Sequence, residues 1–440
     1  MTFLIQALDL IAFRFPLYIM GYWNERSSLK MKKVILLSTI LMSSSAALAA
    51  GYQLQEYSVT GLGRAMAGAG VVGDDYSALA FNPAGMSFNE TSGAQAGLIG
   101  VDLRSHVKGS QTTPLGKTEG KDFTHIFRLL PHAFGQYKLN EQTTLGLGLY
   151  TPFGLATDYR NNWFASAQGQ YSGITVVNLT PALSYKITDT FTLGAGLNLQ
   201  YAAAHLTGAT FDGGWTNMRK ADDTNVGYIV GVTYQPWKST KLGISYRSKV
   251  HHKLHGENKG RAGISGKTGF LNGTHDVYAH ITTPETLIFS AAQDVGQKWT
   301  LSGTARFTRW NRFHDLDIYQ NNYPLAGPMS STHEHWRNTW FFAAGADYRL
   351  CKNITLRFGS AYDQTSIKSP EYRTVRIPDQ RRIWTSLGAS YMKDNWQLDM
   401  GYAHLFVRKA YGAAQTGYVK VDSTWKTQSN ILGVQFQYKF

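Results

Sequence analysis

The stretch FTLGAGLNLQY, which runs from Phe191 to Tyr201, alternates strictly between two kinds of residue. Every odd position of the stretch is apolar, whereas the positions between them are small or polar. Successive side chains of a β-strand point to opposite faces of the sheet, so a period of two predicts a strand with one apolar face. The alternation lasts for eleven residues, which indicates one face in an apolar environment and one face outside it.

The same alternation recurs at Ile383–Tyr391, Trp396–Tyr402 and Val434–Phe440. A soluble β-sandwich would also produce it, but three details favour a barrel in a membrane. The expected strands have about 10–17 residues, whereas strands of soluble proteins usually have about 5–6. Their second face is rich in Gly, Ser, Thr, Gln and Arg rather than Leu and Val. Aromatic residues cluster at strand ends, as in interfacial girdles: Tyr185, Trp237, Trp299, Trp396 and Tyr438.

The composition of the 440 residues agrees with a β-rich chain. Charged residues make up 16%, below the roughly 25% of a typical soluble domain, and 13% aromatic residues argue against a disordered chain. A mean hydropathy of −0.26 excludes a bundle of membrane helices, because each helix needs an apolar run of about 20 residues. The single cysteine, Cys351, excludes an intrachain disulfide and a zinc site built from several thiolates.

Short polar links and long links alternate between the expected strands. Seven long and six short links join fourteen strands, and this even count places both barrel ends on the periplasmic side. A closed barrel also satisfies the backbone N–H and C=O groups inside a bilayer, which an open sheet cannot do. The sequence therefore predicts an all-β fold, a 14-stranded antiparallel transmembrane β-barrel over residues 93–440. The long links are expected near residues 108–122, 151–170, 207–224, 253–274, 313–335, 364–380 and 409–424.

Residues 1–49 have the features of an N-terminal extension and a secretory signal peptide. Met31-Lys32-Lys33 is a basic start, Val34–Met42 is a short apolar run, and Ala47-Leu48-Ala49 is a cleavage site of small residues. We expect cleavage after Ala49. Residues 1–30 precede this signal, and either an over-extended start codon or an extended signal would explain them.

The residues that follow, 50–92, break the strand pattern. They are rich in glycine and alanine and contain Asn82-Pro83-Ala84-Gly85, so short helical turns are expected. An irregular segment of this length needs a place outside the sheet, and the lumen of a fourteen-stranded barrel is wide enough to hold it. We predict that residues 50–92 form a hatch, or plug, inside the barrel.

Six stretches of the chain contain motifs of a known kind: Ala50–Leu54, Gly61–Ala65, Asn82–Ala84, Tyr150–Thr157, Leu242–Ser248 and Ile377–Arg381. The C-terminal Phe440 fits the assembly signal common to outer-membrane barrels. Together these motifs resemble those of the FadL family of outer-membrane transporters for long-chain fatty acids and other hydrophobic molecules. The resemblance starts at the expected mature N-terminus and covers essentially all of residues 50–440.

This resemblance implies an N-terminal hatch, an outer groove between loops, and a deeper pocket gated by the N-terminus. The mobile aromatic residue of the family's N-terminus corresponds to Tyr52, and Leu54 is expected to contact the ligand with it. Simple packing of the hatch is the alternative role for Tyr52. In the family, a kink in the third strand opens the wall sideways, and here that strand contains two residues able to interrupt a ladder. The residues with an implied gating role are Asn82, Pro83, Ala84, Pro152 and Gly154.

The family pocket pairs a fatty-acid carboxylate with two basic side chains. One position falls on Arg337, whose planar and permanently charged guanidinium suits a carboxylate. The other falls near Ala203 in the fifth strand, with His205 close by. This departure leaves open whether the ligand is a fatty acid or a neutral molecule such as an aromatic hydrocarbon. A salt bridge within the lumen is the alternative role for Arg337.

The loop after the third strand is the expected outer groove. Moving an alkyl chain into water costs about 0.8 kcal/mol per CH₂, so its carrier needs a dry pocket with few polar anchors. Packing within the loop, or anchorage in the surrounding lipid, would explain the apolar residues of this region equally well. These residues are Phe153, Leu155, Trp163 and Phe164.

The sequence thus predicts a passive transporter in the outer membrane of a Gram-negative bacterium, which acts as a monomer on long-chain fatty acids or other hydrophobic molecules. An outer-membrane lipid hydrolase and a polar diffusion porin are the alternatives. The chain contains no G-x-S-x-G elbow, so we expect no enzymatic activity, and no cofactor. The charge of +14 is spread along the chain, which favours lipopolysaccharide or outer-membrane lipid over nucleic acid as a partner.

Two groups of histidines stand out, one at His251, His252 and His255 and one at His333 and His335. Their spacing alone would allow a weak metal site. They fall at strand ends or in loops, and we predict no bound metal.

Overall fold

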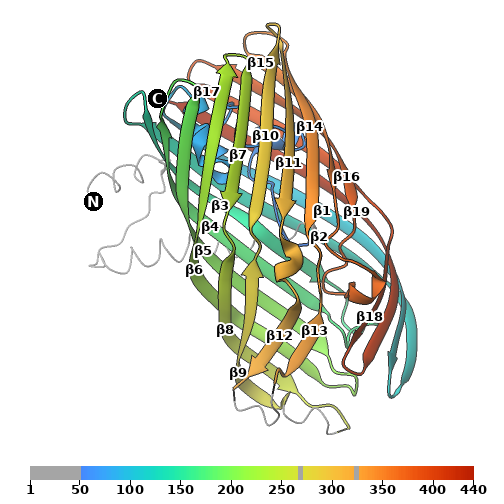
Figure 1. Ribbon diagram of the computed structural model, residues 1–440. Coiled ribbons are helices and arrows are strands. Elements are labelled where there is room, and N and C mark those ends of the chain that lie inside the picture. Colours follow the sequence, from blue (N-terminus) through green and yellow to red (C-terminus); the bar gives the residue numbers. More distant parts are fainter. Residues whose placement is uncertain (1–50, 266–270, 322–326) are drawn as a thin grey trace, which may run out of the picture. The chain divides into compact units, whose positions relative to one another are not determined.

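The computed structural model describes residues 51–265, 271–321 and 327–440, and the predicted signal sequence lies outside them. The described chain is almost entirely β-structure, with a few short helices (Figure 1). No helix among the described residues is long and apolar enough to cross a membrane. The strands are β1 (Gly93–Thr113), β2 (Gly116–Lys138), β3 (Thr143–Asp158), β4 (Tyr171–Lys186), β5 (Phe191–Ala209), β6 (Trp215–Trp237), β7 (Thr240–Arg247), β8 (Val250–Arg261), β9 (Gly273–Thr283), β10 (Thr286–Val295), β11 (Trp299–Thr308), β12 (Asp315–Gln320), β13 (Ser330–His333), β14 (Thr339–Arg349), β15 (Ile354–Asp363), β16 (Arg382–Lys393), β17 (Trp396–Val407), β18 (Ala410–Thr416) and β19 (Val419–Lys439).

The sheet is closed, because β19 at the end of the chain pairs with β1 at its beginning. Five pairs of consecutive strands lie end to end and share neighbours: β7 with β8, β9 with β10, β11 with β12, β13 with β14, and β17 with β18. For example, β6 pairs with both β7 and β8. We call each end-to-end pair, and each remaining single strand, one stave of the wall. Nineteen strands then form fourteen staves (19 − 5 = 14), and all ladders are antiparallel. The predicted 14-stranded antiparallel barrel is confirmed.

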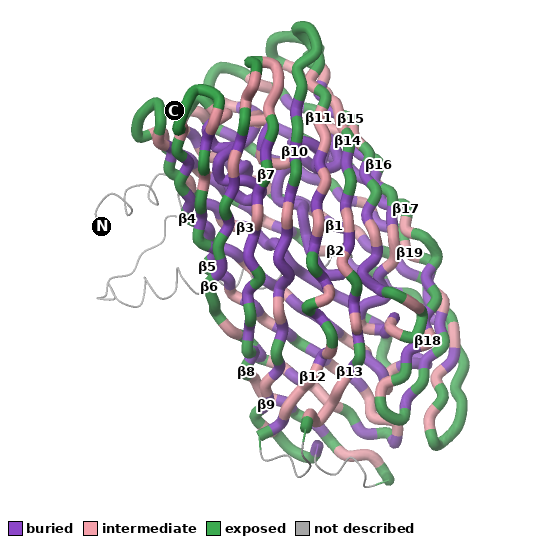
Figure 2. Tube along the Cα trace, in the orientation of Figure 1, coloured by how far each residue is buried: buried purple, intermediate pink, exposed green. Residues whose placement is uncertain are grey.

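Apolar side chains of the wall point outward and polar ones point inward, the reverse of a soluble protein. On β5, Leu197 and Leu199 are 54% and 40% exposed, while Asn198 and Gln200 are each only 1% exposed. Buried and exposed residues alternate in this way along most strands (Figure 2). Membrane hydrocarbon around the barrel explains the exposed apolar band.

The predicted long loops near residues 108–122 and 409–424 are wrong. The ladder between β1 and β2 continues to the pair Thr113–Gly116, so these strands have 21 and 23 residues and exceed the predicted length. Similarly, β18 and β19 are separated by two residues. Beyond the bilayer both faces of a strand meet water, so polar residues occupy both faces and the alternation that identifies a strand disappears.

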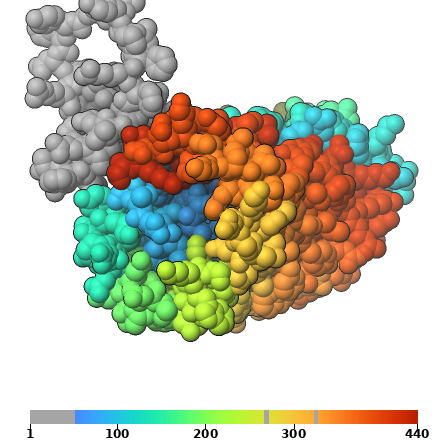
Figure 3. Space-filling view, turned by 90° about the horizontal axis from the view of Figure 1, so that it is seen from above, coloured from blue at the N-terminus to red at the C-terminus, as the bar shows by residue number. Residues whose placement is uncertain are grey.

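Inside the barrel, residues 51–92 form a hatch with three short elements, α3 (Val59–Gly63), α4 (Ala78–Phe81) and η1 (Pro83–Phe88). Viewed along the barrel from the end with the short turns, the hatch (blue) fills the middle (Figure 3). The wall approaches it closely: a Cβ added to Gly388 would lie 2.8 Å from the Cα of Gly63. Both positions therefore need glycine.

Buried ion pairs join the hatch to the wall. Arg64 of the hatch lies 2.7 Å from Asp74, also in the hatch, and 3.0 Å from Asp347 on β14. Arg357 on β15 reaches back to Asp74 at 3.0 Å. Each charge has an opposite partner, which offsets the cost of removing it from water.

Candidate functional site

The N-terminal end of the described chain lies in an aromatic cage, which we define as Phe153, Trp310, Phe313 and Trp336. The ring of Tyr52 is fully buried among them, with centroid distances between 4.7 and 5.9 Å. Phe153 comes from β3, whereas the other three lie where the β11–β12 and β13–β14 staves are interrupted. The cage thus collects side chains from three separate parts of the wall around one hatch residue.

β3 bends next to this cage. Its pairing with β4 shifts between Tyr150 and Phe153, because β3 carries one extra residue there. Pro152 lies in this bulge, and its missing N–H suits an interrupted ladder. The pairing of β3 with β2 covers only six residues and ends at Ala133–Leu149.

The bent part of β3 pairs with the N-terminal segment of the hatch. Leu54 N donates to Pro152 O at 2.8 Å, Gly154 N donates to Tyr52 O at 2.8 Å, and Gln53 faces Phe153 in an antiparallel bridge. A Cβ on residue 154 would lie 2.9 Å from the Leu54 side chain, so glycine permits this approach. The N-terminal segment therefore takes the place that β2 would occupy beside a straight β3.

The structure brings together some of the predicted ligand residues. Tyr52, Phe153 and Leu155 belong to one apolar cluster, which continues along the inner wall to residues such as Val176 and Ile281. Leu54 packs in a separate core within the hatch. Sequence reasoning missed Trp310, Phe313 and Trp336, because they lie in breaks between strands, where no alternation marks the inner face.

The predicted residues Trp163 and Phe164 lie elsewhere. They are buried in a third cluster with Tyr159, whose ring stacks on Trp163 at 3.9 Å, and with Val421 and Trp425 of β19. The loop between β3 and β4 thus packs its aromatic residues against β19, which only β1 and β2 separate from β3 in the wall. Packing within the loop, the alternative role for these two residues, agrees with this placement.

The two predicted basic anchors do not reach the interior. Arg337 is exposed, and its Nε donates to Thr365 O at 3.2 Å. His205 is also exposed and bonds to Asn217 at 3.0 Å, because its neighbours Ala204 and Leu206 are the residues of β5 that point inward. Placing these side chains in the pocket is therefore wrong, and so is a salt bridge inside the lumen for Arg337.

Arg376, in contrast, has the environment expected of a side chain that binds a carboxylate. Nη1 of Arg376 donates to Ser172 Oγ at 2.9 Å and to two backbone carbonyls, and it forms no ion pair within the described chain. It lies in the connection between β15 and β16, next to Ile377 of the inner apolar cluster. Burial lowers the pKa of Arg376 to about 10, while the charge of Glu334 acts in the opposite direction. The guanidinium stays protonated at neutral pH.

The predicted hatch motif fixes the hatch to the wall. Asn82 Oδ1 accepts a hydrogen bond from Ala84 N at 3.1 Å and caps η1, which begins at Pro83. Asn82 Nδ2 donates to Val232 O of β6 at 3.0 Å. One side chain therefore caps the start of a hatch element and also bonds to the barrel wall.

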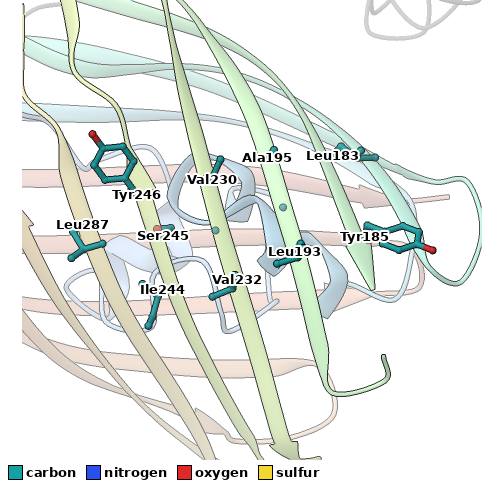
Figure 4. Close-up of a pocket in the computed structure, with 12 residues that line it drawn as sticks. Leu183, Tyr185, Leu193, Ala195, Val230, Val232, Ile244, Ser245, Tyr246 and Leu287 are labelled. Carbon is teal, nitrogen blue, oxygen red and sulfur yellow. The ribbon is translucent and has the colours of Figure 1, made fainter. Parts of the chain in front are cut away.

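A hollow of about 500 Å³ on the outer wall spans β4, β5, β6, β7 and β10 (Figure 4). Outward side chains such as Leu193, Val230 and Ile244 line it. It faces the membrane and not the cage, so it belongs to the lipid-contacting surface.

Comparisons with known proteins agree with this architecture. A family model described as Outer membrane protein transport protein (OMPP1/FadL/TodX) matches residues 40–440. Outer membrane protein P1 of Haemophilus influenzae is 27% identical over 466 residues, which cover 93% of this chain and 100% of the relative. The long-chain fatty acid transport protein of Escherichia coli strain K12 is 24% identical over 448 residues, which cover 93% and 98%. The crystal structure of a Pseudomonas aeruginosa FadL homologue has a TM-score of 0.80 and 25% identity, covering 89% of this chain and 100% of that one.

The family match extends over nearly the whole chain, and the closed barrel with its apolar outer band agrees with a location in the outer membrane of a Gram-negative bacterium. The chain belongs to the OMPP1/FadL/TodX family of outer-membrane transport proteins.

Proposed function

We propose that this protein carries long-chain fatty acids, or hydrophobic molecules of similar size, passively across the outer membrane. The observation that supports this most directly is the N-terminal segment, which occupies an apolar cage and completes the bent part of β3. A ligand that displaces this segment would remove Tyr52 from the cage and, at the same time, leave the bent part of β3 without its partner. The carriers among the relatives, including one named as a long-chain fatty acid transport protein, support the same substrate class.

In the proposed path, the acyl chain enters from the outer end along the inner apolar cluster, and its carboxylate meets Arg376. The chain then replaces Tyr52 in the aromatic cage. The exit lies between β2 and β3, on the outer side of the pair Ala133–Leu149, where the ladder between these strands ends. The molecule would leave sideways into the hydrocarbon of the membrane without crossing water.

The energetics favour long ligands. Displacing Tyr52 costs about 1.5–3 kcal/mol of lost burial, and breaking its segment's two backbone bonds to β3 costs about 1 kcal/mol each. A ligand recovers about 0.8 kcal/mol for each CH₂ it buries, so about six methylene groups offset the displacement. A short carboxylic acid cannot open such a gate, whereas a long-chain acid can.

A reversible lock on the N-terminal segment tests this function. Gln53 and Phe153 face each other without bonding to each other, and such pairs have Cα atoms about 4.5 Å apart, within disulfide range. We would place cysteines at both positions in a Cys351→Ser background and measure uptake of labelled oleate into cells that lack their own carrier. Uptake should stop when the disulfide forms and return when it is reduced.

The single Phe153→Cys variant in the same background is the control for loss of the aromatic ring. If the oxidised double variant remains as active as the reduced one, the N-terminal gate is refuted. If the unmodified protein takes up neither oleate nor an aromatic hydrocarbon faster than empty cells, the transport function itself is refuted.

We further propose that the protein acts as a monomer without catalysis, since one chain closes the barrel and its family is one of transporters. Lipopolysaccharide is the proposed neighbour of the outer end, where basic side chains such as Lys117 and Arg160 are exposed. Neither the hydrolase nor the porin is supported by a specific feature of the site.

A further inference from the structure

We infer that the outer end of the barrel binds one divalent transition-metal ion through Asp315, His333 and His335. These residues lie on β12, on β13 and just after β13. Their side chains are accessible from outside, whereas the neighbouring cage residues Phe313 and Trp336 are buried. One oxygen and two ring nitrogens, one atom from each residue, all lie within 4.8 Å of one another. The inference does not depend on the proposed transport function.

The pairing of two strands sets the first half of the site. Asp315 and His333 are direct partners in the β12–β13 ladder, so their side chains leave the sheet side by side. Nδ1 of His333 lies 2.6 Å from Oδ1 of Asp315, and Nε2 of His335 lies 3.9 Å from the same oxygen. Small rotations of the side chains would bring all three atoms around a single ion.

An unusual backbone conformation supplies the third ligand. His335 has φ +42°, a left-handed value that a non-glycine residue seldom adopts. The N–H groups of Glu334 and His335 both donate to the carbonyl of His314, at 2.8 Å each, and hold the chain in this turn. In an ordinary extended strand His335 would continue away from the ladder, whereas here its ring lies beside Asp315.

His314 prepares His335 for metal binding. The two Nδ1 atoms lie 3.5 Å apart, so a proton on Nδ1 of His335 can be donated to His314. Nε2 of His335 is then a free lone pair facing Asp315. Metal-bound histidines usually have such an outer partner, which fixes the tautomer and the orientation of the ring.

The ligand set selects a class of ion. Two imidazole nitrogens and one carboxylate suit Zn²⁺, Co²⁺, Ni²⁺ or Cu²⁺, whereas Ca²⁺ and Mg²⁺ prefer sites made of oxygen. The side chains are accessible from outside, with exposures of 66% for His333, 38% for His335 and 32% for Asp315. An ion from the medium can therefore reach the site, with water completing its coordination.

A second group of histidines provides a matched control. His251 and His280 stack on the neighbouring strands β8 and β9 with their ring centroids 5.5 Å apart. His251 uses its Nδ1 for a contact of 2.8 Å with Thr282. Within the described chain, no carboxylate completes a three-residue metal group there.

The test uses the full-length, untagged barrel in detergent. Titration with Zn²⁺ followed by calorimetry should give one strong site per chain, and Co²⁺ should give the visible absorption of nitrogen and oxygen ligation. His333→Asn and Asp315→Asn should each weaken Zn²⁺ binding by at least about tenfold, as expected when a metal site loses a supporting group. His251→Asn should leave the affinity unchanged. Heat-dependent electrophoretic mobility verifies that each variant is a folded barrel.

The inference is overturned if the unmodified protein binds no Zn²⁺. It is equally overturned if folded His333→Asn and Asp315→Asn variants bind as tightly as the unmodified protein, or if His251→Asn weakens binding as much as they do. Loss of binding in His333→Asn and Asp315→Asn alone supports it.

Discussion

Gly51 fits closely against two tryptophans of the aromatic cage. Its φ is +66°, and an added Cβ would lie 2.3 Å from Trp336 and 2.9 Å from Trp310. We expect Gly51→Ala to oppose the closed position by about 2–5 kcal/mol, from about 1–2 for left-handed backbone and about 1–3 for overpacking. Hydrogen exchange at the amides of residues 52–54, followed by mass spectrometry, should become faster.

Gly417 provides the control for this substitution. It also has a left-handed φ, +55°, but a Cβ there would meet nothing within 4 Å. Gly417→Ala should leave exchange near the N-terminus unchanged. Unaltered exchange in Gly51→Ala would show that the two tryptophans do not hold the segment.

Substitutions of Arg376 and Arg337 test which of the two arginines binds the carboxylate of the ligand. Arg376→Ala should weaken binding of oleate by about 10- to 100-fold, because a hydrogen bond to a charged group contributes about 1.5–3 kcal/mol. Binding of oleyl alcohol should change little. Arg337→Ala should affect neither ligand, since Arg337 is exposed on the outside. Equal losses for acid and alcohol in Arg376→Ala, measured by ligand titration, would remove its anchor role.

At this scale, the sequence identified apolar residues of the interior better than charged ones. Tyr52, Phe153 and Leu155 do share one buried cluster. Arg337 and His205 do not lie inside, because a shift of one residue along a strand reverses the face on which a side chain lies. Near a bulge or a break of a strand, alternation no longer shows which face a residue occupies. Arg376 lies in a connection without periodicity, so no pattern marked it.

The proposed exit beside β2 depends on the bulge in β3. From Tyr150 to Phe153 the chain advances three residues while its partner advances two, from Asn178 to Val176. Deleting Pro152 should restore the register, straighten β3 and reduce uptake of oleate strongly, because the exit beside β2 closes. The barrel should still assemble, as shown by its heat-dependent mobility.

A second bulge allows a matched deletion. Between β5 and β6, one strand advances two residues, from Ala204 to Leu206, while its partner advances three, from Met218 to Ala221. Deleting Lys220, an exposed residue of this bulge, should leave uptake unchanged. If both deletions reduce uptake equally, the effect arises from assembly and not from the bend.

Elements were predictable where a bilayer imposes alternation. Phe191–Tyr201 was recognised because hydrocarbon contacts one face and the lumen contacts the other. For the outer parts of β1 and β2 the sequence predicts a loop, because Lys117–Lys121 is exposed without alternation. The breaks within five staves also escaped detection, since each interrupts only a few residues.

Considered as a whole, the molecule depends on a charged link between the hatch and the wall. Arg64→Ala would remove the hydrogen-bonded cation of Asp347 and leave it only Arg357, 3.7 Å away, at a cost of about 1.5–3 kcal/mol of hatch anchoring. We expect a higher ion conductance in planar bilayers, while the wall ladders keep the barrel folded. Lys117→Ala removes an exposed pair with Glu119 and should leave conductance unchanged. Unchanged conductance in Arg64→Ala would show that other contacts suffice to retain the hatch.

The number of strands and the closure of the barrel follow from the sequence, because thirteen links separate fourteen strands and an even number of strands returns the chain to its starting side. Two of the long links are in fact short turns, but this changes their length and not their number. The contacts that the hatch makes inside the barrel could not be predicted in this way. Contacts such as Tyr52 with Trp310 and Trp336 join residues more than 250 positions apart, and no local pattern encodes them.

The short ladder between β2 and β3 has a mechanical consequence. Twenty-one rungs join β1 to β2 and nine join β14 to β15, but only six join β2 to β3. Under lateral tension on the barrel, the hydrogen bonds between β2 and β3 would break first, beginning at the outer end of their ladder. Swelling of the surrounding bilayer would therefore act on the proposed exit before it strained any other part of the wall.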